Sequence, residues 1–139
     1  MMENFLNTYR ALNKDNLHRL KEIYAEDVRF IDPAHTINGL AQLRRYFGAL
    51  YRDIDPPVFR FIHDLRVNED AYVQWEMDFM HPRLNRGRII TISGSSYLRF
   101  NEDNKVCFHR DYFDLGAMLY EQLPVLGKLI LFVKRGLGR

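Results

Sequence analysis

The sequence predicts an α+β domain in which one sheet packs on three N-terminal helices and a further helix follows at the C-terminus. Three observations predict it. Apolar residues recur at helical spacing in three stretches before residue 55, they follow strand patterns between residues 58 and 113, and helical spacing returns after residue 115. The breaks between the predicted strands are short and polar, which is typical of antiparallel hairpins.

The first two predicted helices carry clear apolar faces. Residues 3–13 place Phe5, Tyr9 and Leu12 on one side of a helix. Asp15 or Asn16 can then cap a second helix at its N-terminus. We expect the buried stripe of this second helix to consist of Leu17, Leu20 and Tyr24.

A short strand separates the second predicted helix from the third. This strand, residues 28–32, ends at Pro33, which cannot donate a hydrogen bond to a sheet. Asn38 and Gly39 open the third helix, and Asp55, Pro56 and Pro57 end it. Its apolar stripe is expected to be Leu40, Leu43, Phe47 and Leu50.

Four longer strands follow, at residues 58–67, 71–80, 88–100 and 106–113. Polar breaks at 68–70 and 101–104 mark turns between them. The tail, residues 115–137, is helical in pattern and is interrupted at Pro124. No repeat or linker divides the chain, so we expect a single domain over residues 1–139, with a core at 3–114 and a helical tail at 115–139.

Length, charge and cysteine content limit the classes of function. A chain of 139 residues is near the usual size of one domain. The net charge is only +2 and no basic stripe alternates with aromatics, so we expect no nucleic-acid partner. Cys107 is the only cysteine, and residues 1–16 lack the apolar run of a signal peptide. Both features favour the cytoplasm.

Two segments of the chain carry a family resemblance. Residues 24–33 read YAEDVRFIDP and precede Gly39 at the start of the third helix, and residues 109–114 read HRDYFD. From about Phe5 to Phe113 this order resembles the nuclear transport factor 2-like superfamily, which includes ketosteroid isomerases, limonene epoxide hydrolases and SnoaL-like polyketide cyclases. The resemblance implies that an antiparallel or mixed sheet is strongly curved and forms a cone over the helices, with a pocket inside. Proteins of this superfamily include enzymes, binding proteins and assembly modules.

The resemblance also implies where polar groups would meet. Residues two apart on a strand share a face, so His109 and Asp111 point with Phe113 into the cone. Asp32 matches the general base of ketosteroid isomerases, and Tyr9 matches their oxyanion tyrosine with a one-residue gap. Ser96 stands where those enzymes have a protonated aspartic acid. The candidate catalytic residues are Asp32, His109, Asp111 and Tyr9, and the candidate ligand-binding residues are Trp75, Met77, Ser96, Phe113, Phe30 and Phe61.

This set of residues suits proton transfer on a small apolar molecule. Burial destabilises the charged form of a carboxylate, and histidine titrates near neutral pH. Two assignments are open: Asp32 as the base with His109 and Tyr9 as donors, or Asp111 as the base oriented by His109, which is the SnoaL-like variant. The reaction would be an isomerisation, a cyclisation or an epoxide hydrolysis.

Readings without catalysis are also open. His109 and Asp111 could form a buried structural pair, or the cone could hold an apolar ligand without chemistry. A third alternative is an interaction module that dimerises through its sheet face or its tail. No histidine pair has the spacing of metal ligands, and we expect neither a metal nor another cofactor.

The tail suggests a partner. One side of its predicted helix consists of Leu126, Leu129, Ile130, Val133 and Leu137, with Lys128 and Arg135 opposite. That stripe can pack on the domain, whereas Leu131 and Phe132 would stay exposed. The exposed pair favours a homodimer, a peripheral membrane contact supported by Lys134, Arg135 and Arg139, or a lid over the pocket.

Overall fold

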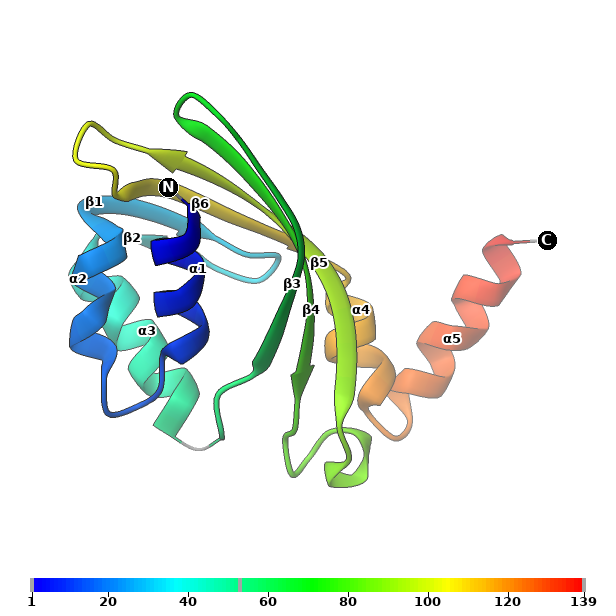
Figure 1. Cartoon of the computed structure of the whole chain (residues 1–139). Coiled ribbons are helices and arrows are strands. Elements are labelled where there is room, and N and C mark those ends of the chain that lie inside the picture. Colours follow the sequence, from blue (N-terminus) through cyan, green and yellow to red (C-terminus); the bar gives the residue numbers. More distant parts are fainter. Residues whose placement is uncertain (1, 53, 139) are drawn as a thin grey trace.

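The elements of the computed structural model follow the predicted order (Figure 1). It describes residues 2–52 and 54–138, so the predicted contribution of Arg139 lies outside the described residues. The helical segments before β3 are α1 (Met2–Ala11), the one-turn η1 (Leu17–Arg19), α2 (Leu20–Ile23) and α3 (Leu40–Arg52). The strands are β1 (Tyr24–Ile31), β2 (Thr36–Asn38), β3 (Val58–Val67), β4 (Asp70–Phe79), β5 (Ile90–Phe100) and β6 (Val106–Phe113). The remaining helical segments are η2 (Asn85–Gly87), α4 (Leu115–Met118), η3 (Tyr120–Gln122) and α5 (Leu126–Leu137).

The six described strands form one mixed sheet in the order β2-β1-β6-β5-β4-β3. Strands β1 and β6 are parallel, and all other neighbours are antiparallel. The register of the β3–β4 pair shifts between Phe61 and His63, where β3 has one extra residue, and the register of the β5–β6 pair shifts opposite Arg99 and Phe100, where β6 has one extra residue. Such irregularities bend a strand and increase its twist. The sheet therefore curves, and Figure 1 shows α1, α2 and α3 on its concave side, which confirms the predicted α+β cone.

The core lies between the three helices and the concave face of the sheet. Leu20 of α2, Leu43 of α3 and Leu98 of β5 are fully buried there. The predicted stripe of the third helix was wrong at its end, because Tyr51 is buried and Leu50 is exposed. A helix turns by about 100° per residue. In the last turn of α3, the side that faces the core is therefore displaced by one residue from the predicted one.

Two local predictions around β1 were wrong. Tyr24 does not continue the second helix; it begins β1, pairs with Val106 of β6, and is buried. Strand β2 was not foreseen, although it pairs with β1 over three residues. Gly39 follows β2 with φ of 89°, a conformation that glycine adopts without strain, and its N–H donates to the Val28 carbonyl at 2.7 Å.

The tail differs from the expectation of a helix packed by its apolar stripe. Helix α5 extends away from the body of the molecule (Figure 1). Within α5, Gly127 is its only buried residue among those that the structure describes. Lys134, which was expected to support a membrane contact, instead forms ion pairs with Asp114 and Glu121. None of the described helices is both long and apolar enough to span a bilayer.

Candidate functional site

A cavity of about 250 Å³ lies inside the cone. Its wall combines residues of α1, β1, α3, β3, β4, β6 and α4. The wall is mainly aromatic, with Tyr9, Phe30, Phe47, Phe59, Trp75 and Phe113 among its members. Asp32 and Asp111 also reach this wall, and no Lys or Arg is among the described residues that line it. Such a cavity favours an apolar, uncharged occupant.

The cavity gathers most of the predicted site residues. Those that line it are Tyr9, Phe30, Asp32, Trp75, Met77, Asp111 and Phe113. His109, Ser96 and Phe61 do not line it; they border a separate void of only about 20 Å³, next to Asp111. His109 is thus placed behind Asp111 rather than in contact with a ligand in the main cavity. The guanidinium of Arg10 lies over the ring of Phe61, 5.2 Å from its centroid.

A chain of buried hydrogen bonds ends on Asp111. The Tyr24 hydroxyl lies 2.6 Å from Nδ1 of His109, and Nε2 of His109 lies 2.6 Å from Oδ1 of Asp111. On the other side, Nε1 of Trp75 donates to the Ser96 hydroxyl at 2.9 Å, and Ser96 donates to the same Oδ1 at 2.5 Å. These bonds fix the position of the carboxylate from two directions.

One protonation pattern gives every donor in this series of hydrogen bonds an acceptor. It has a neutral His109 with its proton on Nε2, an ionised Asp111, and Tyr24 donating to Nδ1. Burial, with the charge of Asp111 adding to it, raises the pKa of Tyr24 well above its usual value, so Tyr24 keeps its proton. His109 therefore orients Asp111 in the way that a second residue orients a catalytic base.

The second oxygen of Asp111 is available to a ligand. The hydrogen bonds from His109 and Ser96 to this carboxylate both go to Oδ1. Oδ2 of Asp111 has no hydrogen-bond partner among the described residues. The Asp111 side chain is 13% exposed and lines the cavity. The hydrogen bonds to Oδ1 fix the carboxylate, and Oδ2 of Asp111 thus faces an apolar space.

Asp32, by contrast, already uses both of its oxygens. Oδ1 accepts from the backbone N–H groups of Ala34 and His35 at 2.8 and 2.7 Å and lies 3.1 Å from Nδ1 of His35. Oδ2 accepts from the hydroxyl of Tyr46 at 2.8 Å. The backbone bonds form the turn that follows β1 at Pro33. In this arrangement Asp32 orients Tyr46 and His35 at the side of the cavity.

Three phenols face the cavity in their neutral form. Burial raises the pKa values of Tyr9, Tyr46 and Tyr51, and the negative charge of Asp111 raises them further. For Tyr46 the charge of Asp32 and the hydrogen bond to it add to the effect. The hydroxyls of Tyr9 and Tyr51 have no hydrogen-bond partner among the described residues, so both can donate to a ligand.

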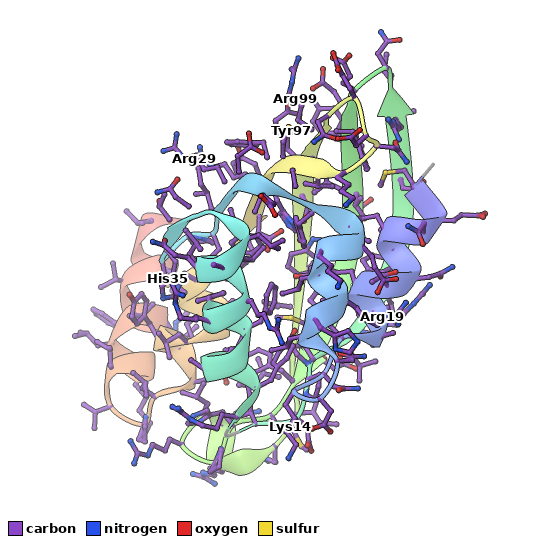
Figure 2. The ribbon with its side chains drawn as sticks, turned by 90° about the vertical axis from the view of Figure 1, so that its left-hand side faces the viewer. Lys14, Arg19, Arg29, His35, Tyr97 and Arg99 are labelled. Atoms are coloured by element: carbon purple, nitrogen blue, oxygen red, sulfur yellow. The ribbon has the colours of Figure 1, made fainter. Side chains whose placement is uncertain are left out.

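Sequence reasoning missed five polar residues of the site: Tyr24, His35, Tyr46, Tyr51 and His81. Tyr24 was placed on a helix, and Tyr51 was hidden by the apolar Leu50 beside it. Tyr46 sits next to Phe47 on α3, at the margin of the apolar stripe, where a polar tip can reach a cavity. His35 is close to Asp32 in sequence; it lines the cavity, and about half of its side chain is also exposed to solvent near α3 (Figure 2).

Another depression is larger but lies outside the cone. A groove of about 850 Å³ runs between α2 and α3, with Lys14, Lys21 and Arg44 among its lining residues; Lys14 is at the foot of the helical layer in Figure 2. None of the predicted site residues lines it. In residues 2–52 and 54–138, no three His, Cys, Asp or Glu residues are grouped so as to hold a metal ion. The candidate site is therefore the cavity in the cone.

Comparisons with solved structures agree with this fold. A protein with a ketosteroid isomerase-like fold from Catenulispora acidiphila, in complex with trimethylamine, has a TM-score of 0.75 at 16% identity, over 89% of this chain and 96% of that one. A nuclear transport factor 2-like protein of unknown function from Burkholderia pseudomallei has a TM-score of 0.73 at 18% identity, over 85% and 93% of the two chains. TerC, co-crystallised with polyporic acid, has a TM-score of 0.72 at 14% identity, over 84% and 93%.

Sequence comparison gives the family. No curated protein matches the chain. The family model of the SnoaL-like domain matches residues 5–109. This range includes most of the sheet, α2 and α3, and all of α1 except residues 2–4. The match covers well over half of the chain. With its mixed, curved sheet and its helices on the concave side, the chain belongs to the SnoaL-like domain family, within the nuclear transport factor 2-like fold.

Proposed function

We propose that the cone binds a small, uncharged, apolar carbonyl compound and that Asp111 removes a proton from the carbon next to its carbonyl group. The observation that carries the proposal is the unpaired Oδ2 of Asp111 in a cavity with an aromatic wall. A carboxylate that is held in place and partly shielded from water is a suitable general base.

Residues of the cavity can accept the proton and can stabilise the negative charge that its removal creates. The proton passes from the carbon to Oδ2 of Asp111, and the electron pair of the C–H bond moves into the enolate. The oxygen of the enolate then carries the negative charge. A neutral phenol stabilises such an oxygen by donating a hydrogen bond. The hydroxyls of Tyr9 and Tyr51 both lack a partner among the described residues, and Tyr9 fits this role better because it borders both the main cavity and the small void beside Asp111, whereas Tyr51 does not border that void. Return of the proton to another carbon gives an isomer.

The cavity sets the size of the ligand. A cavity of about 150 Å³ accepts benzene, and drug-sized ligands need at least about 300 Å³. At about 250 Å³ the cone fits a molecule with one or two rings. The structurally similar proteins crystallised with trimethylamine and with polyporic acid support a small-molecule ligand in this fold.

A binding experiment tests the first half of the proposal. Trp75 is the only tryptophan and lines the cavity, so its fluorescence reports an occupant. We expect a saturable change of emission with 2-tetralone, a neutral ketone with two rings. Benzoate should give none, because it meets carboxylates and no Lys or Arg. Equal affinity for benzoate would contradict the proposed uncharged ligand.

A second experiment tests the chemistry. In D₂O, NMR follows the exchange of the hydrogens next to the carbonyl group of each ketone that binds. We expect exchange faster than in buffer alone. If ketones bind and their exchange is not accelerated, the proton transfer is refuted, and the cone is a binding site only.

We also propose a homodimer through the outer face of the sheet. Leu65, Val67, Tyr72 and Tyr112 are exposed there, and large exposed apolar groups on one sheet face are typical of an interface. The rings of Tyr72 and Tyr97 lie 5.3 Å apart on this face. Analytical ultracentrifugation should give twice the chain mass, and Tyr72→Asp should lower it; a wild-type monomer at all concentrations would rule this interface out.

A further inference from the structure

Helix α5 presents an apolar face to solvent. The exposed fractions of Leu129, Phe132, Val133 and Leu137 are 58%, 69%, 53% and 82%. At about 100° per residue, these side chains cover one continuous side of the helix. Apolar residues gathered in this way are uncommon on a surface that meets only water.

Contacts with the preceding segment hold this face outward. Lys134 is on the other side of α5, where its Nζ lies 2.9 Å from Oε2 of Glu121 and 3.3 Å from Oδ2 of Asp114. Gly127 packs so closely on the backbone of Glu121 that a Cβ atom would lie 2.3 Å from the Glu121 carbonyl oxygen. Since Gly127 and Lys134 occupy the side toward the body, the apolar side cannot turn inward without breaking both contacts.

The border of the apolar face is positively charged. Lys128 and Arg135 lie next to Phe132 around the helix, and neither side chain has an ion pair or hydrogen bond to another described residue. Residues 126–138 contain no Asp or Glu. The two acids closest along the chain to α5, Glu121 and Asp114, are already paired with Lys134. An occupant of this face therefore needs an apolar phase bordered by negative charge.

We propose that α5 binds an anionic phospholipid surface, lying in the plane of the interface. Apolar side chains would enter the boundary between headgroups and acyl chains, while Lys128 and Arg135 would contact phosphates. A helix of 12 residues is about 18 Å long, too short to cross a bilayer. Pairing of α5 with α5 of a second copy is less suitable, because it would bring cations together without any acid on either helix.

Flotation with vesicles tests this inference independently of the ligand in the cone. We expect the wild-type protein to float with vesicles of phosphatidylcholine and phosphatidylglycerol, and not with phosphatidylcholine alone. Phe132→Ser should weaken binding at least tenfold through lost apolar burial. Lys128→Gln and Arg135→Gln should each weaken it about fivefold at low salt, since one cation near such a surface contributes about 1 kcal/mol.

Matched variants on other surfaces serve as controls. Ile89→Ser, just before β5, and Lys14→Gln at the foot of the helices also remove one exposed group each, and they should leave flotation unchanged. All these positions are exposed, so thermal unfolding should be the same in every variant.

Three results would overturn the inference. They are no flotation of the wild-type protein with anionic vesicles, equal losses in the control variants, and a lower mass of Phe132→Ser in ultracentrifugation without vesicles. The last result would assign the face to a second copy of the chain instead.

Discussion

Two aspartates at the wall of one cavity differ in how their oxygens are used. Asp32 accepts hydrogen bonds on both oxygens, whereas all bonds to Asp111 converge on Oδ1. The hydrogen bonds of Asp32 thus hold Tyr46 and His35 in place, whereas Oδ2 of Asp111 has no partner among the described residues. Both residues were identified from the sequence, but the choice between them depends on hydrogen bonds from Tyr46 and Ser96, which no local pattern reveals.

Tyr9→Phe tests the role of the donor. The substitution removes a hydroxyl that no described residue binds, so the fold should be unchanged. Removing one donor to a developing oxyanion typically costs about 10²–10³ in rate. We expect a loss of this order in hydrogen exchange on a bound ketone, with little change in the Trp75 binding signal. Tyr72→Phe, on the outer face, is the matched control; a similar loss there would point to an indirect effect.

At the scale of elements, the strands were predictable and their bends were not. The four long strands match their predicted ranges to within two residues, because alternation and polar turns are local signals. Strand β2 has three residues and no pattern of its own. The register shifts in β3 and β6 that curve the sheet depend on how each strand pairs with its neighbour. In α5 the exposure of Phe132 was predicted correctly. The exposure of Leu129 and Val133 was not, because the side of α5 that faces the body is set by Gly127 and Lys134.

Gly94 of β5 lets the wall of the cavity form. A Cβ atom at this position would lie 2.4 Å from the ring of Trp75, which packs directly on the strand. We expect Gly94→Ala to displace this ring, to destabilise the protein by about 1–3 kcal/mol, and to weaken ketone binding. Denaturant unfolding and Trp75 fluorescence measure the two effects. Ser95→Ala, one residue on and facing outward, should change neither; unchanged Trp75 emission in Gly94→Ala would contradict the proposed packing.

At the scale of the whole molecule, the cone encloses several phenols together. Burial raises the pKa values of Tyr9, Tyr24, Tyr46 and Tyr51 in the folded state. In the unfolded chain they ionise near pH 10. Above that pH the unfolded state binds fewer protons than the folded state, so stability falls as pH rises. Below pH 10 the phenols are protonated in both states, and their contribution is constant.

Alkaline unfolding measures this effect. Each buried phenol should steepen the fall in unfolding free energy by up to about 1.4 kcal/mol per pH unit above pH 10. Tyr51→Phe should reduce the slope by one such step, while Tyr112→Phe at an exposed position should not. Absorbance at 295 nm should show that the exposed tyrosines ionise first. Ionisation of all eight tyrosines near pH 10 in the folded protein would contradict the enclosed site.

The most direct test compares Asp111→Asn with Asp32→Asn in the same exchange experiment on a bound ketone. We expect Asp111→Asn to retain the Trp75 binding signal and to lose about 10²–10⁴ in exchange rate, which is the usual contribution of a general base. Asp32→Asn should retain most of the exchange. The reverse order, with exchange lost in Asp32→Asn and kept in Asp111→Asn, would contradict the assignment of Asp111 as the base.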